Sequence, residues 1–101
     1  MFARNPKYPL RSAQAKLAPR GSQFSHTEAY RLFLQAMNDS ARQIVIDLQQ
    51  IEEATTSAFA QLVVLRRMLL RHGRDLCVTG LRDRAEGLFE VNRLGGVLPR
   101  M

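Results

Sequence analysis

The chain has 101 residues, a hydrophobic content of 46% and a formal net charge of +6. This length allows one domain with a single core, and no apolar run approaches the ~20 residues of a membrane span. No apolar stretch follows the basic N-terminus, so the sequence predicts no secretory signal. The single cysteine, Cys77, cannot form an internal disulfide. We expect it to be a small buried hydrophobe in a reducing cytoplasm.

The positive charge is concentrated at the start of the chain. Five Lys or Arg residues and no acidic residue precede Glu28, and the rest of the chain holds ten Lys or Arg against nine Asp or Glu. Pro6 and Pro9 cannot donate to a sheet ladder, so residues 1–12 are expected to form an extended basic arm before a domain at residues 13–101. Such an arm could contact nucleic acid or acidic lipid. It lacks aromatic residues interleaved with the basic ones, and a solvated tail is the favoured interpretation.

The first part of the domain predicts a short strand and a helix. Ala13–Ala18 alternates weakly, and Pro19–Ser22 has turn composition. Ser25 and Glu28 have the spacing of a capping box, in which each side chain accepts a hydrogen bond from the other's backbone amide. The helix that follows has one apolar stripe at helical spacing, formed by Ala29, Leu32, Phe33, Ala36 and Met37.

The middle of the chain predicts a strand, a helix and a second strand. Gln43–Leu48 is apolar and mostly β-branched, as a strand covered on both faces should be. A helix is expected over Thr56–His72, with Gly73 as its left-handed stop. Leu76–Val78 is a second apolar run. A strand, a crossover helix and a strand of this length make a parallel pair with a right-handed connection.

The last part of the chain predicts a third helix over Asp83–Arg93, stopped by Gly95 and Gly96. Val97–Leu98 is expected to add a stub of strand. The order of elements therefore predicts an α/β domain with a small sheet.

The motifs of common active sites do not occur: there is no HExxH, paired CxxC, GxGxxG or GxxxxGK[ST]. We therefore predict no catalytic residue, metal or cofactor. Three consecutive hydroxyls, Thr55, Thr56 and Ser57, lie where a strand ends and a helix begins, the usual ligand position in open α/β sheets. One hydroxyl can simply cap the helix. Alternatively, a phosphate there would meet free amides and a favourable dipole, beside Glu52 and Glu53.

The central helix carries two apolar stripes. One stripe suffices for the core and consists of Ala58, Leu62, Leu65 and Leu69. The second is offset by roughly 100° and consists of Phe59, Val63 and Leu70. A helix that is apolar over most of its circumference is either buried on both sides or docks a second surface.

These segments together resemble the STAS family, which includes anti-sigma-factor antagonists and the cytoplasmic tails of sulfate transporters. The match runs from about Pro19 to Leu98, and it is carried by Ile44–Leu48, Thr55–Ala60, Leu65–Gly73, Leu76–Leu81 and Leu94–Leu98. The resemblance implies a single domain with a small mixed β-sheet and three to four helices. The family's first hairpin is truncated, because only Ala13–Ala18 is available for it. That leaves a sheet edge for the arm or a second copy to cover, so a homodimer is possible.

The resemblance also implies a function. Ser57 falls on the serine that partner kinases phosphorylate in the antagonists, and Thr56 falls on the hydroxyl before it. Thr55 replaces the family's aspartate, and Ala58 and Ala60 replace its two glycines.

The chain would then be a bacterial, cytoplasmic, non-enzymatic regulator of transcription. Its partner would be an anti-sigma factor and serine kinase of the histidine-kinase-like ATPase type. The predicted contact consists of Thr55, Phe59, Val63, Arg66 and Arg67.

A second interpretation is a regulatory subunit of a phospholipid-transport ABC ATPase. The ending Gly96–Arg100, with a threonine at position 56, resembles the STAS subunit of the Mla phospholipid transporter. A neighbouring gene for a transporter ATPase, rather than for a kinase-like ATPase, would separate the two interpretations. Nucleic-acid binding through the basic arm is a third hypothesis, and it predicts a steep salt dependence.

Overall fold

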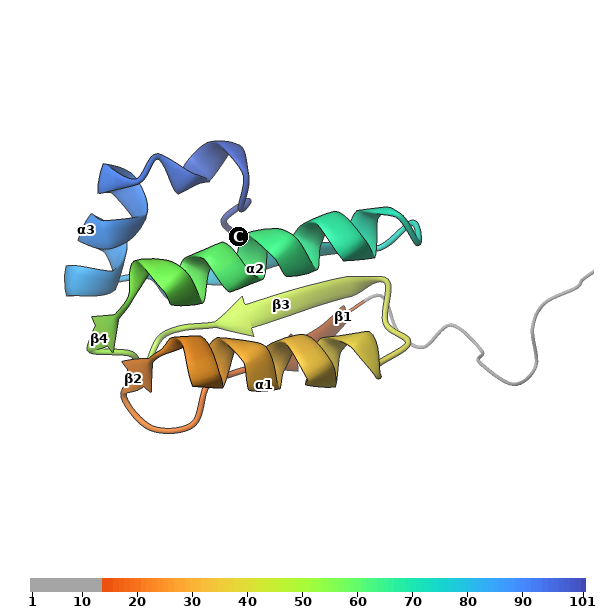
Figure 1. The fold of residues 1–101 in the computed structure, drawn as a ribbon, viewed down its shortest axis with the longest axis horizontal. Helices are drawn as coiled ribbons and strands as arrows, with labels where there is room; N and C mark the ends of the chain where they lie inside the picture. Colours follow the sequence, from red (N-terminus) through yellow and green to blue (C-terminus); the bar gives the residue numbers. More distant parts are fainter. Residues whose placement is uncertain (1–13) are drawn as a thin grey trace, which may run out of the picture.

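The computed structural model describes residues 14–101, so the expected basic arm at residues 1–12 lies outside the described part of the chain. The chain forms alternating short strands and helices (Figure 1). In order, the elements are β1 (Gln14–Leu17), β2 (Gln23–Phe24), α1 (His26–Met37), β3 (Gln43–Asp47), β4 (Glu53–Ala54), α2 (Thr56–Leu70), β5 (Asp75–Thr79), α3 (Asp83–Val91) and the 3₁₀ turn η1 (Leu94–Gly96).

The main sheet has the strand order β1-β3-β5, and both of its ladders are parallel. Ile44 at its centre lies opposite Ala15 on one side and Leu76 on the other. The predicted parallel pair bridged by a helix is therefore confirmed, and so is the strand expected at Ala13–Ala18. All ladders between the strands of residues 14–101 are parallel, so the described part of the chain does not show the mixed sheet that the resemblance implies.

A second, two-stranded ladder brings the starts of α1 and α2 together. β2 pairs with β4 in parallel, with Gln23 opposite Glu53 and Phe24 opposite Ala54. The ladder continues into the helix cap, because the Thr55 amide donates to the Phe24 carbonyl at 3.1 Å. Both helices leave this ladder in the same direction and run side by side over one face of the main sheet (Figure 1).

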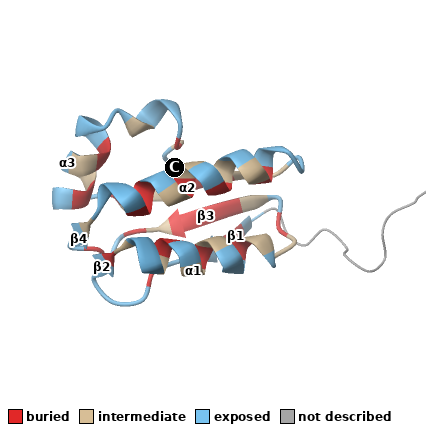
Figure 2. Cartoon of the chain, in the orientation of Figure 1, coloured by how far each residue is buried: buried red, intermediate tan, exposed pale blue. Residues whose placement is uncertain are grey.

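The core lies between these two helices and the sheet. The expected stripe of α2 (Ala58, Leu62, Leu65, Leu69) is buried along its whole length, and each leucine contributes about 1.5–3 kcal/mol through burial. In α1, Ala29, Leu32 and Ala36 are buried and the remaining stripe residues pack against the core. Cys77 is buried as expected. Figure 2 shows the buried residues on the inner sides of both helices and along β3.

The predicted capping box forms only in part. Ser25 Oγ accepts from the Glu28 amide at 3.3 Å, as expected. The Glu28 carboxylate does not reach back to the Ser25 amide. It accepts instead from the Arg20 amide at 2.8 Å and from the Arg31 guanidinium at 3.0 Å. These hydrogen bonds, that of Arg31 foremost, lower the pKa of Glu28. A charged donor outcompetes a neutral amide for the carboxylate, which is the reason for the difference.

Two glycines take the left-handed conformation that their turns require. Gly73 ends α2 with φ +70°, as predicted, and Gly80 follows β5 with φ +77°. A Cβ at Gly80 would lie 2.8 Å from the Gln49 amide nitrogen, so this turn packs closely against the loop after β3. Both positions therefore favour glycine.

The end of the chain differs from the prediction. Val97–Leu98 is not a strand, because the amides of both residues donate to the Leu94 carbonyl in the 3₁₀ turn. Leu98 is instead fully buried in the core. Pairing with β5 begins afterwards, where the Val78 amide donates to the Pro99 carbonyl at 2.9 Å and Arg100 forms a parallel bridge with Val78.

Candidate functional site

The hydroxyl cluster lies at the start of α2, at the carboxyl ends of the strands. Thr55 is the N-cap, with an extended backbone (φ −113°, ψ 154°), and its Oγ1 accepts from the Ala58 amide at 3.1 Å. This hydrogen bond satisfies one of the amides that every helix leaves free at its start. Thr55 therefore positions the first turn of α2, and its contact with a partner stays a prediction.

The other two hydroxyls are exposed to solvent. Ser57 Oγ lies 3.1 Å from Thr55 Oγ1, so the structure brings these two side chains together. Thr56 is also exposed, one position away around the helix. Successive helical residues are turned by about 100°, so Thr56 and Ser57 face different neighbours.

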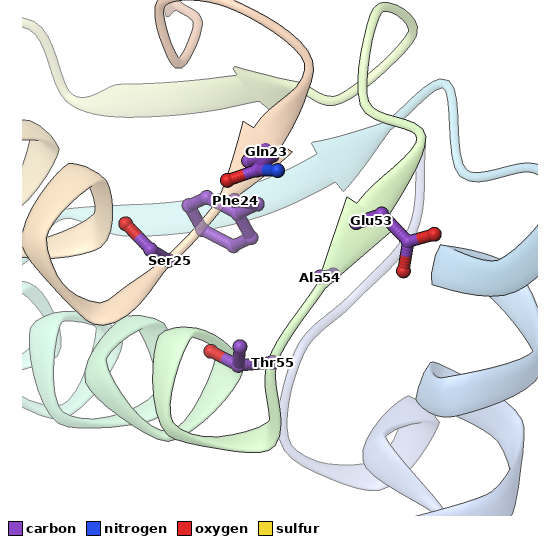
Figure 3. Close-up of a pocket in the computed structure, with 6 residues that line it drawn as sticks. All are labelled: Gln23, Phe24, Ser25, Glu53, Ala54 and Thr55. Carbon is purple, nitrogen blue, oxygen red and sulfur yellow. The ribbon is translucent and has the colours of Figure 1, made fainter.

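A hollow of about 480 Å³ lies between the starts of the two helices. Its lining consists of Gln23, Phe24, Ser25, Glu53, Ala54 and Thr55 (Figure 3). The two N-cap residues, Ser25 and Thr55, lie across this hollow from each other, and Phe24 is almost completely buried between them. Two helix N-termini in one place produce a positive potential. The Glu53 carboxylate is directed towards α3, where it forms an ion pair with Arg84.

Phe59 is not part of a surface. Its side chain is fully buried, with edge-to-face contacts to Phe24 at 5.6 Å and to Phe89 at 6.0 Å between ring centroids. The expectation that Phe59 contacts a partner is therefore wrong. The physical reason is that Phe24 of β2 and Phe89 of α3 enclose the ring, a covering that the sequence left open.

The predicted contact residues farther along α2 line a second, smaller hollow. Val63, Arg66, Arg67 and Leu70 enclose about 70 Å³ together with Val97. Val63 is half-buried against the core, whereas Arg67 is exposed. Their contact with a partner stays a prediction.

Arg66 has a structural role within the domain. Its Nε donates to Asp75 Oδ1 at 2.7 Å, and its Nη1 donates to the Val97 carbonyl at 3.2 Å. Burial disfavours the charged form of Asp75, but the hydrogen bonds from Arg66 and from the Leu76 amide outweigh it and lower the pKa of Asp75. Arg66 thus connects the segment after η1 to the start of β5.

Residues 14–101 contain no group of three His, Cys, Asp or Glu side chains that could hold a metal ion. In the same part of the chain, no helix has the length and apolar character needed to span a membrane.

Comparison with known proteins identifies the fold. No protein-family model matches the sequence, and a search of curated proteins gives no match. The structure is similar to the crystal structure of a sulfate transporter family protein from Wolinella succinogenes, with a TM-score of 0.71 and 15% sequence identity. The similarity covers 88% of this chain and 74% of that one. The fold is STAS-like. This confirms the predicted α/β class, whereas identity this low carries no residue-level role from one protein to the other.

Sequence reasoning missed the convergence of the two helix starts. The signal was present, because Gln23-Phe24-Ser25 and Glu53-Ala54-Thr55 are each a polar residue, an apolar residue and a capping hydroxyl before a helix. Two such triplets at the carboxyl ends of neighbouring strands are placed to pair with each other.

Proposed function

We propose that this protein is a non-enzymatic regulatory domain that binds a partner protein and is switched by phosphorylation at Ser57. The partner would be an anti-sigma factor of the histidine-kinase-like ATPase type, as the resemblance implies. The observation that carries the proposal is the exposed Ser57 hydroxyl on a rigid, capped helix start. A kinase can reach this hydroxyl without unfolding the domain.

A phosphate on Ser57 would change the surface and leave the fold intact. Ser57 is the second residue of α2, where a negative charge is stabilised by the helix dipole. The cap survives, because Thr55 still accepts from the Ala58 amide when its contact with Ser57 is lost. The added charge of about −1.5 to −2 would therefore act mainly on the partner.

The packing of α2 places Ser57 and Thr56 on different flanks of the helix. Phe59 contacts α3 and Arg66 contacts the segment after η1, so this flank of α2 faces the C-terminal part of the domain. Thr56 shares that flank with Phe59, three residues later. Ser57 lies on the opposite flank, towards α1. The predicted contact residues Val63, Arg66 and Arg67 line the hollow on the Thr56 flank, so the packing does not choose between the two hydroxyls. Ser57 is the favoured switch position because the resemblance aligns it with the phosphorylated serine.

The test compares three substitutions in binding assays with the partner purified from the native organism. Ser57→Asp should weaken binding at least about tenfold, or ~1.4 kcal/mol, whereas Ser57→Ala should bind like the unmodified protein. Thr56→Asp adds the same charge on the other flank, and a loss of affinity in Thr56→Asp alone would assign the switch to Thr56. Unchanged affinity in Ser57→Asp would refute the switch.

A second candidate is a regulatory subunit of a transport ATPase, such as a phospholipid-transport ABC ATPase. The structural similarity to a sulfate transporter family protein agrees with association with a transporter, and the ending Gly96–Arg100 carries the resemblance to the transport-ATPase subunit. The two candidates differ in the ATPase that co-purifies. A kinase-like ATPase should transfer phosphate from ATP to Ser57, whereas a transport ATPase should bind the domain without modifying it.

A further inference from the structure

The smaller hollow on α2 combines apolar and basic side chains. Its lining consists of Val63, Arg66, Arg67 and Leu70 on α2 and Val97 after η1, and we call it the η1 hollow. Figure 1 shows η1 and the end of the chain beside α2. Val63 packs against the core, whereas Leu70 is 48% and Val97 39% exposed. The η1 hollow therefore has an apolar wall that is open to solvent.

The size of the η1 hollow limits what can occupy it. Its volume is about 70 Å³, and a cavity of about 150 Å³ holds one benzene molecule. The η1 hollow therefore has room for an aliphatic group of about three or four carbons, such as the side chain of valine or leucine. A nucleobase is larger than benzene and does not fit.

The charge at the η1 hollow is positive. The charged residues in its lining are Arg66 and Arg67, and the sequence of α2 contains no Asp or Glu. Arg66 is already held by Asp75 at 2.7 Å. Arg67 is exposed and forms no ion pair within residues 14–101, and the same holds for Arg71, one turn later on the same flank. An apolar hollow thus lies next to unpaired guanidinium groups.

These features favour a protein segment over other occupants. Attraction to an anionic membrane surface typically takes a cluster of about four to eight Lys or Arg residues, whereas the unpaired ones on this flank of α2 are Arg67 and Arg71. A second copy that placed its own η1 hollow against this one would bring these arginines against each other, which is unfavourable. A carboxylate, by contrast, matches the guanidinium of Arg67 with two parallel hydrogen bonds.

We propose that the η1 hollow binds a segment of the partner protein in which a valine or leucine lies next to a carboxylate. The aliphatic side chain would fill the hollow against Val63, as an anchor residue does in other interfaces. The carboxylate would accept hydrogen bonds from Arg67. This inference deepens the proposed function and rests on it for the existence of the partner.

The η1 hollow and the proposed switch are separated along α2. Val63 follows Ser57 by six residues and Arg67 follows it by ten, which is roughly 9–15 Å at 1.5 Å per residue. This separation exceeds the Debye length of about 8 Å at physiological salt. A phosphate on Ser57 would therefore act on the part of the partner near the start of α2 and leave the η1 hollow able to bind.

The probe is a synthetic peptide of about seven residues with a central leucine, glutamates on both sides of it and glycines at its ends. In two control peptides, the leucine is replaced by serine or the glutamates are replaced by lysines. Binding to the full chain is followed by amide and methyl chemical shifts in NMR, which detect dissociation constants on the order of 1 mM. The acidic peptide should perturb Val63, Leu70 and Val97, and each control peptide should bind at least about tenfold more weakly.

Substitutions in the protein separate the two contributions. Val97→Ser should weaken the acidic peptide about three- to tenfold, because it removes part of the apolar wall. Arg67→Gln should weaken it by a similar factor and flatten its salt dependence. Arg20→Gln is the matched control, because it removes the same charge at the start of α1, where Arg20 contacts Glu28. It should leave the affinity unchanged, and circular dichroism should show all variants folded.

Other occupants of the η1 hollow would give different results. The inference is overturned if the acidic peptide causes no shift changes at the η1 hollow or binds no better than its controls. It is also overturned by a dimer in sedimentation that Val97→Ser dissociates, because a second copy would then occupy the hollow. Binding to phosphatidylglycerol vesicles that Arg67→Gln abolishes would likewise assign the surface to lipid.

The inference and the proposed function fail separately. If Arg67→Gln weakens the native partner and Ser57→Asp does not, the η1 hollow is a docking site and the proposed switch fails. If Ser57→Asp releases the native partner and Arg67→Gln changes neither partner nor peptide binding, the switch stands and this inference fails. The affinity of Ser57→Asp for the acidic peptide should equal that of the unmodified protein, because the η1 hollow lies beyond the screening length.

Discussion

Phe59 offers the sharpest test of how α2 is packed, because the sequence left burial and partner contact open for its stripe and the structure buries it. Truncation to alanine in a core typically costs about 3–5 kcal/mol. This is a large part of the roughly 5–15 kcal/mol that stabilises a domain of this size, so Phe59→Ala is expected to unfold much of the protein. Phe59→Leu is the better probe. It keeps most of the apolar volume but removes two edge-to-face ring pairs.

Each such pair contributes about 0.5–1.5 kcal/mol beyond area burial, so two pairs give an expected loss of about 1–3 kcal/mol in Phe59→Leu. The assay is urea unfolding followed by circular dichroism. Val91→Ala is the control: Val91 is 80% exposed, so its truncation should change stability by less than about 0.5 kcal/mol. If Phe59→Leu has the same urea midpoint as the unmodified protein but weakens partner binding, the ring is a surface contact and the packing described above is wrong.

Three further predictions concern stability. Thr55→Ala removes the α2 cap and should cost about 1 kcal/mol in chemical unfolding, whereas Thr55→Ser should retain most of it; equal losses would exclude capping as the cause. Gly80→Ala should lower the melting temperature clearly more than Gly73→Ala. The backbone angle φ is positive at both positions, but only at Gly80 would the added Cβ lie within 3 Å of backbone atoms. Equal melting temperatures of the two variants would contradict this. The pKa of Asp75 is lowered in the native state, so its contribution to stability is present above the ordinary value of 3.8 and is lost as the pH falls through the lowered native value. Asp75→Asn should make the unfolding free energy less dependent on pH in that acid range, and an unchanged acid profile would contradict the role given to the Arg66 ion pair.

The central strand, helix and strand could be predicted because their signals are local. Ile44–Leu48 is β-branched and apolar, the inner stripe of α2 repeats at helical spacing, and Gly73 provides the stop. Each of these features fixes the backbone without knowledge of distant neighbours. The capping role of Thr55 was likewise one of the two interpretations that its position allowed.

The remaining features depend on packing between elements far apart in the sequence. The sequence does not say which element covers the second apolar stripe of α2. In the structure, Phe59 is internal because Phe24 and Phe89 pack against its ring. β2 and β4 have two residues each, too few for a periodic pattern. The sequence aligns Ser57 with the phosphorylated serine of the antagonists, but only the structure shows which flank of α2 each hydroxyl occupies.

The most direct measurement of the central claim is hydrogen exchange of the full chain with and without its partner. The account predicts added protection in peptides from α2, where Ser57 and the predicted contact residues lie. It also predicts that Ser57→Asp removes this protection under the same conditions. Protection confined to α3, with α2 unchanged, would contradict the account.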